Sequence, residues 1–125
     1  MITKQPLLIL VAGPYRSGTN DDPALISRNV ETMTNVALQL YNRGHLPVLG
    51  EWLALPLIEA AGSTQIGDAV FNNLFHHIAI QLLHRCDAVL RIGGPSAGAD
   101  EMMSLGRQLG KQLFYDFTEI PPHHT

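Results

Sequence analysis

RIGGPSAGADEMMSLGRQLGKQLFYDF, residues 91–117, contains the pattern of a strand end, a glycine-rich loop, a helix and a second strand. Ser96 is of the residue type that caps a helix start, and Gly110 is of the type that ends one. The apolar stripe of this helix consists of Met102, Leu105, Gly106 and Leu109. Residue 102 is therefore predicted to point toward the sheet, with Glu101 about 100° away around the helix.

The rest of the chain repeats this alternation of strand and helix. Continuous apolar runs closed by glycine are typical of buried parallel strands. The predicted strands are LLILVAG (7–13), HLPVLG (45–50), DAVLRIGG (87–94) and QLFYDF (112–117). Asp22 and Pro23 predict the start of a first helix that ends near Gly44. Apolar periodicity predicts another helix over residues 71–82, and TEIPPHHT (118–125) is expected to be a tail.

The segment EWLALPLIEAAG (51–62) is predicted to be a short, broken helix because Pro56 interrupts it. The complete order predicts a single α/β domain over residues 1–125. The expected fold is a doubly wound, Rossmann-like or flavodoxin-like sheet of four to five mostly parallel strands with helices on both faces. Ligands bind beyond the carboxyl ends of the strands in such sheets.

Composition narrows the functional classes. The chain has 125 residues, 46% of them hydrophobic and 15% charged, with a net charge of −3. These values favour a well-packed core and argue against a nucleic-acid polymer as partner. The apolar run near the N-terminus is too short to span a bilayer, and no small-residue cleavage site follows it, so a signal peptide is not expected. The single cysteine, Cys86, is expected to be a buried thiol, and a cytoplasmic location is expected.

Two predicted loops supply candidate ligand-binding groups. In AGPYRSGT (12–19), Gly13 and Gly18 would let the backbone approach a ligand, and Arg16 and Ser17 could donate to an anion. A solvated turn is the alternative for that loop. After the second strand, Glu51 could bind a sugar hydroxyl and Trp52 could stack on a base. A helix-start glutamate and a core tryptophan are the alternatives there.

The loop GGPSAGADE (93–101) is the strongest motif. Ser96 and the free N–H groups behind it favour an anion. Asp100 and Glu101 also have a structural explanation, because acids in the first turn stabilise the helix dipole. His76 and His77 are adjacent on one helix, so they point in different directions and a metal site built on the pair is not expected. At most one of them could face the strand ends.

Four segments taken together carry a family likeness: LVAGPYRSG (10–18), RGHLPVLGEW (43–52), LLHRCDAVLRI (82–92) and PSAGADEMMSLGRQLGKQLFY (95–115). Their order and spacing resemble the nucleoside 2-deoxyribosyltransferase superfamily, including the deoxyribonucleoside 5′-monophosphate N-glycosidases and small bacterial relatives. This resemblance covers most of the chain. It implies cleavage of an N-glycosidic bond, without cofactor or metal, by a glutamate in a motif S-x-G-x-x-x-E. It also implies that Tyr15 positions this glutamate and that Arg16, Ser17, Gly18 and Ser96 hold a phosphate. Sites completed by a neighbouring subunit are common in the family.

The sequence departs from this motif at the nucleophile. Counting from Ser96 and Gly98, the family glutamate falls on Met102, whose thioether cannot attack as a carboxylate does. Three hypotheses follow. A shift of the helix start could bring Glu101 inward, or Asp100 or Glu51 could supply the carboxylate. In the third, the protein binds a nucleotide without cleaving it.

The sequence therefore favours an enzyme acting on a nucleoside or nucleotide, with a non-catalytic nucleotide-binding module as the alternative. Glu101 is the first candidate for the catalytic acid, followed by Asp100 and Glu51. The apolar segments WLALPLIEAAG (52–62) and VFNNLF (70–75) suggest a further hypothesis, a homo-oligomer such as a dimer or tetramer.

Overall fold

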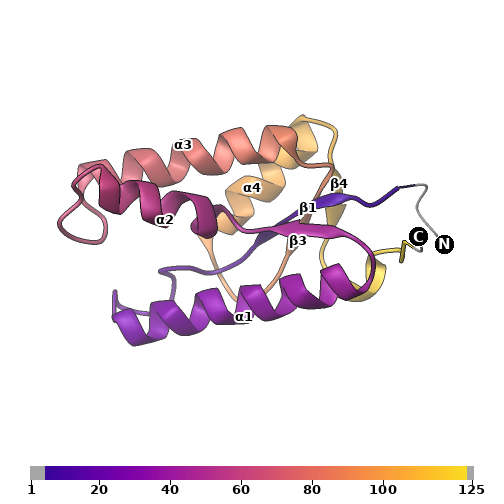
Figure 1. Ribbon diagram of the computed structural model, residues 1–125, viewed down its shortest axis with the longest axis horizontal. Coiled ribbons are helices and arrows are strands. Elements are labelled where there is room, and N and C mark those ends of the chain that lie inside the picture. Colours follow the sequence, from indigo (N-terminus) through magenta and orange to yellow (C-terminus); the bar gives the residue numbers. More distant parts are fainter. Residues whose placement is uncertain (1–4, 124–125) are drawn as a thin grey trace.

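Four parallel strands run through the centre of the molecule in the computed structural model, which describes residues 5–123 (Figure 1). The strands are β1 (Leu8–Ala12), β2 (Leu46–Val48), β3 (Ala88–Arg91) and β4 (Gln112–Phe114). Their order is β2-β1-β3-β4, and every pairing is parallel. The predicted α/β class and parallel sheet are confirmed, with the arrangement of a Rossmann-like or flavodoxin-like fold.

Helices cover both faces of this sheet (Figure 1). The helices are α1 (Pro23–Asn42), α2 (Gly50–Ala60), α3 (Ala69–Arg85) and α4 (Ala97–Gln108). Alternate residues of β1 point to opposite faces, so Val11 packs with α1 and Leu10 packs with α3 and α4. Both faces of the central strands are therefore buried, as their continuous apolar sequence predicts.

Side-chain caps set the helix starts that the sequence indicates. Asp22 accepts a hydrogen bond from the backbone N–H of Ala24, with Pro23 in the first helical position. Ser96 Oγ accepts one from Ala99, at 3.2 Å. The Ser96 cap fixes where α4 begins, beside the carboxyl end of β3.

The prediction that Pro56 breaks its helix is wrong. Helix α2 continues through Pro56, which costs the helix one backbone hydrogen bond. The apolar face of α2, which includes Ala54 and Ile58, packs against Phe71 of α3, and this burial offsets the loss. An unbroken α2 holds Glu51 in its first turn.

The C-terminal part differs from its prediction in two ways. Strand β4 ends at Phe114, and a short 3-10 helix, η1 (Phe117–Glu119), replaces the predicted strand end. The described part of the expected tail, residues 118–123, packs onto the core. Ile120 is fully buried, and His45 contacts Pro121 O through Nε2 at 2.6 Å. Residues 124–125 lie outside the described residues. Leu109, predicted to face the core, is the C-cap residue of α4 and is exposed.

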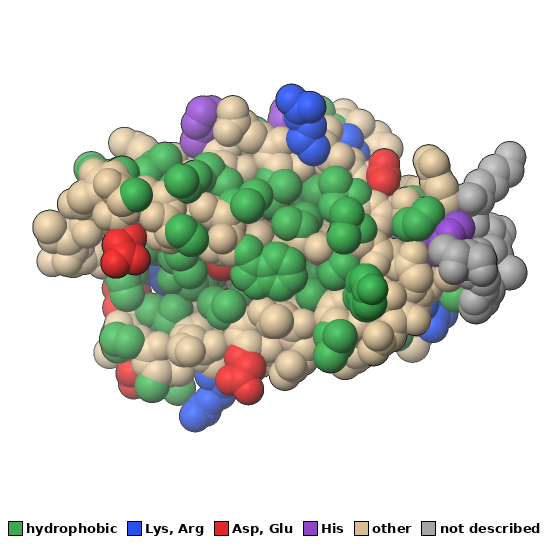
Figure 2. Space-filling view, in the orientation of Figure 1, with side chains coloured by type: hydrophobic (Ala, Val, Ile, Leu, Met, Phe, Trp, Pro, Cys, Tyr) green, Lys and Arg blue, Asp and Glu red, His purple; other side chains and the backbone are tan. Residues whose placement is uncertain are grey.

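One surface of the molecule is rich in exposed apolar side chains. Figure 2 shows hydrophobic groups spread across the face that carries α1 and α2. The exposed large apolar residues of these two helices and of β2 are Leu38, Tyr41, Leu46, Trp52, Leu53 and Leu57. No helix within residues 5–123 is long and apolar enough to cross a membrane.

Candidate functional site

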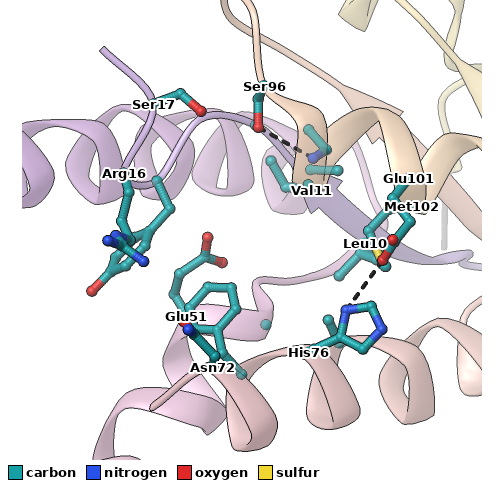
Figure 3. Close-up of a pocket in the computed structure, with 18 of the residues that line it drawn as sticks. Leu10, Val11, Arg16, Ser17, Glu51, Asn72, His76, Ser96, Glu101 and Met102 are labelled. Atoms are coloured by element: carbon teal, nitrogen blue, oxygen red, sulfur yellow. Dashed lines mark hydrogen bonds and ion pairs between the residues drawn. The ribbon is translucent and has the colours of Figure 1, made fainter. Parts of the chain in front are cut away.

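A cavity of about 610 Å³ opens at the carboxyl ends of β1 and β3 (Figure 3). The chain leaves β1 toward β2 on one side, whereas β3 lies on the other side of β1, so the sheet order reverses here. Open α/β sheets bind their ligands at this kind of reversal. The cavity therefore lies where the sequence-based fold assignment predicts a ligand.

Most of the predicted site residues meet in this cavity. The predicted residues that line it are Gly13, Tyr15, Arg16, Ser17, Glu51, Ser96, Gly98 and Glu101. Three predicted residues, Gly18, Trp52 and Asp100, do not belong to its lining.

Glu51 is the most unusual group of the cavity. The first turn of α2 carries it, its carboxyl points into the open space, and only 7% of the residue is exposed (Figure 3). Burial raises the pKa of this carboxyl to about 7, against a hydrogen bond from its own backbone N–H that favours the ionised form. No other residue among the described ones pairs with the carboxyl, so it enters the cavity with capacity for a ligand.

Three aromatic rings form one wall beside Glu51. Tyr15 follows β1, and Phe71 and Phe75 come from α3. The ring centroids of Tyr15 and Phe75 are 5.2 Å apart, and those of Phe71 and Phe75 are 5.6 Å apart. Burial, and then the nearby charge of Glu51, raise the pKa of the Tyr15 hydroxyl. The result is an apolar, aromatic surface that can contact a planar ring.

Arg16 lines the cavity but already carries an acidic partner. Its Nε and Nη2 donate to the two carboxylate oxygens of Asp21 at 2.8 and 2.9 Å. This contact raises the pKa of Arg16 and lowers that of Asp21. The guanidinium also lies over the ring of Phe71, 5.9 Å from its centroid. A phosphate at this position would share Arg16 with Asp21.

Glu101 and His76 meet at another wall, where α4 faces α3 (Figure 3). His76 Nδ1 lies 3.2 Å from Glu101 Oε1, and the Glu101 side chain is 46% exposed. His76 is therefore the one histidine of the adjacent pair that lines the cavity. It holds the Glu101 carboxyl at the cavity edge while leaving the second oxygen available.

Asp100 points elsewhere. Its carboxylate accepts a hydrogen bond from Arg91 Nε at 3.0 Å, and its side chain is 70% exposed. Arg91 also donates to the carbonyls of Ile92 and Gly94, which ties the glycine-rich loop to the first turn of α4. Asp100 therefore has a structural task and is not a cavity carboxylate.

Met102 occupies the inward position, as the helix phase predicts. It is buried, lines the cavity and packs in the same core cluster as Leu10 and Ala99. The position that the motif assigns to a glutamate thus carries an apolar thioether next to Glu101 (Figure 3). The floor of the cavity is less polar here than the family motif implies.

The structure contradicts both predicted roles of Trp52, the stacking on a base and the core position. It is 41% exposed, and its Nε1 donates to Thr34 Oγ1 of α1 at 3.3 Å. Trp52 follows Glu51 directly on α2, so when Glu51 points into the cavity its neighbour turns about 100° away. The tryptophan is neither a core residue nor a stacking platform for a ligand in the cavity.

Two functional features of α3 were not predicted. Phe71 and Phe75 belong to the apolar periodicity that predicts the helix and to VFNNLF (70–75), which suggests an oligomer interface, yet both side chains line the cavity. Asn72 lines the cavity with an amide whose Nδ2 donates to Gly67 O at 2.9 Å. Their only sequence signal is position: they lie on the same helix as His76, at its N-terminal end.

Other reactive groups lie outside the cavity. Within residues 5–123 there is no group of three or more His, Cys, Asp or Glu side chains able to hold a metal ion. Cys86 is buried, and burial raises the pKa of its thiol to about 11. The thiol is therefore not a nucleophile at neutral pH.

No protein-family model matches the chain, and no curated protein matches it.

Proposed function

We propose that the protein cleaves the N-glycosidic bond of a nucleoside or nucleotide bound in the cavity, as a hydrolase or transferase. The observation that carries the proposal is a pair of carboxyl groups in different surroundings within one cavity. Glu51 is buried and keeps its proton up to about pH 7, whereas Glu101 is half exposed and held by His76. Pairs of carboxyl groups in different surroundings are typical of acid-assisted glycoside chemistry.

The two groups divide the reaction between them. As the bond between the anomeric carbon and the base nitrogen breaks, the base takes the proton of Glu51 and leaves as a neutral molecule. The Glu101 carboxylate stabilises the positive charge that develops on the sugar. Water, or the hydroxyl or nitrogen of an acceptor, then bonds to the anomeric carbon, and the proton it loses returns to Glu51.

The remaining lining residues fit the parts of such a substrate. The aromatic wall of Tyr15, Phe71 and Phe75 suits the base. Ser17 and Ser96 both line the cavity, Ser96 at the start of α4, and they suit the sugar or a 5′-phosphate (Figure 3). The resemblance to nucleoside 2-deoxyribosyltransferases supports the same assignment.

A second function is favoured by Met102. A protein that has methionine at the position of the family nucleophile could bind a nucleotide without cleaving it. The cavity, its aromatic wall and the start of α4 would serve binding equally well. Only the roles of Glu51 and Glu101 would then differ.

Turnover separates the two functions. The purified protein is incubated at pH 6 with a panel of nucleosides, 2′-deoxynucleosides and their 5′-monophosphates, and free base is measured by chromatography. We expect base release from at least one compound at a rate proportional to protein concentration. Saturable binding without any base over many hours would support the binding module and contradict the enzyme.

We also infer that the chain forms a homo-oligomer in the cytoplasm. The exposed apolar residues of α1, β2 and α2 support an interface between copies, because monomers rarely expose a large contiguous apolar surface (Figure 2). A single, buried cysteine fits a reducing compartment. Light scattering on a size-exclusion column is expected to give a mass of at least two chains at micromolar concentration. The mass of one chain would contradict this.

A further inference from the structure

We propose that the Glu51 carboxyl recognises the base, and that it selects a 6-aminopurine by pairing with the exocyclic amino group and the neighbouring ring nitrogen N7. This inference rests on the proposed function, because it names the base whose glycosidic bond is cleaved. It assigns to one side chain both the choice of base and the delivery of the proton.

The starting observation is that the Glu51 carboxyl accepts a hydrogen bond from its own backbone N–H and pairs with no other described residue. The residue is more than nine-tenths buried, its carboxyl is aimed into the cavity, and no side chain within residues 5–123 hydrogen bonds with it (Figure 3). A carboxyl group can make several hydrogen bonds, and leaving most of this capacity unused in a buried site is costly. A ligand in the cavity would satisfy the group.

Charges around Glu51 do not favour its ionised form. The charged or titratable groups that face it across the cavity are Tyr15 and Arg16 after β1, His76 on α3 and Glu101 on α4. The Arg16 guanidinium is bound by Asp21, and His76 contacts Glu101. Arg16 and His76 therefore both have acidic partners, and burial keeps Glu51 protonated up to about pH 7.

A neutral carboxyl carries one donor and one acceptor side by side. The N7 edge of adenine presents the complementary pair, a ring nitrogen that accepts and an amino group that donates. The same edge of a 6-oxopurine presents two acceptors, O6 and N7, so one of them would face the carbonyl oxygen of Glu51. A neutral Glu51 therefore distinguishes the two purines at this edge.

The proposed chemistry favours N7 as the contact. N7 belongs to the same five-membered ring as the nitrogen that bears the sugar, so a proton placed on N7 makes the base a better leaving group. The hydrogen bond from Glu51 to N7 thus lies on the path of the proton transfer. The aromatic wall beside Glu51 would hold the plane of the two fused rings.

Binding is tested with bases that cannot be cleaved. Affinities of 9-methyladenine, 9-methylhypoxanthine and 9-methyl-7-deazaadenine are measured by titration calorimetry with the full chain at pH 6 and pH 8.5. We expect 9-methyladenine to bind roughly tenfold or more tightly than either analogue at pH 6, which is the usual discrimination of a two-bond contact. Its affinity should fall by about tenfold or more at pH 8.5, because an ionised Glu51 no longer donates.

Two variants provide the matched controls. Glu51→Gln keeps a donor and an acceptor, so it should retain the preference for 9-methyladenine but lose the dependence on pH. Glu51→Leu should lose the preference. Circular dichroism verifies that both variants are folded.

The outcomes distinguish this inference from the function on which it rests. Equal affinity for 9-methyladenine and its 7-deaza analogue, or tighter binding of 9-methylhypoxanthine, would overturn the inference even if the enzyme releases base. Selective release of a pyrimidine would overturn it as well. Failure of every purine to bind, with no base released from any nucleoside, would overturn both proposals.

Discussion

Replacing Glu51 with glutamine is expected to make the protein more stable above pH 7, by as much as about 3 kcal/mol. In the unfolded chain this carboxyl has its ordinary pKa of 4.5, and in the folded protein burial raises the pKa to about 7. Between these values the folded protein holds a proton that the unfolded chain has released, so stability falls as pH rises. Below pH 4.5 both states are protonated and this loss vanishes.

Glutamine removes the titration and keeps the shape of the side chain. The stability of wild type and variant is measured by urea unfolding between pH 5 and pH 8. The difference in unfolding free energy should grow from below about 1 kcal/mol at pH 5 to about 3 kcal/mol at pH 8. Glu59→Gln is the control, because Glu59 is exposed on the same helix. Parallel pH profiles for wild type and Glu51→Gln would contradict a buried, neutral Glu51.

Glu101→Gln is expected to lower the rate of base release by at least about 100-fold, since the amide cannot stabilise the positive charge on the sugar. Asp100→Asn is the matched control on the adjacent residue. Its side chain faces solvent and pairs with Arg91, so the rate should stay within about twofold of wild type. The measurement is the initial rate of base release under saturating substrate.

A reversed pattern would overturn the assignment of Glu101. Loss of activity in Asp100→Asn with little change in Glu101→Gln would mean that the first turn of α4 presents the other acid to the substrate. Met102→Glu adds a further comparison. If base release appears only in Met102→Glu, the native chain is a binding module whose inward carboxylate is missing.

The sequence predicts the fold well because its signals are local and agree with one another. Apolar runs ended by glycine give β1, β2 and β3, and Asp22, Pro23 and Ser96 give the starts of α1 and α4. The helix phase that puts Met102 inward depends only on the geometry of one helix. The strand order then brings the loops after β1 and β3 together.

The failures arise where distant contacts outweigh local preference. Pro56 does not break α2, because packing against α3 stabilises the helix. Arg16 has the right chemistry for a phosphate, but only the folded loop brings Asp21 onto its guanidinium. Which of Glu51 and Trp52 enters the cavity depends on the rotation of α2 against α3, which no short motif specifies.

The most direct test of N-glycosidic bond cleavage in this cavity is the release of free base from a nucleoside or its monophosphate at pH 6. This release is compared between the wild type and the double variant Glu51→Leu/Glu101→Gln, purified in the same way. We expect base release by the wild type and none above background by the double variant, with both proteins folded. Equal release by the two proteins would assign the activity to another site or to a contaminant. Absence of release by the wild type, with every compound of the panel at saturating concentration, would contradict the claim that this cavity cleaves an N-glycosidic bond.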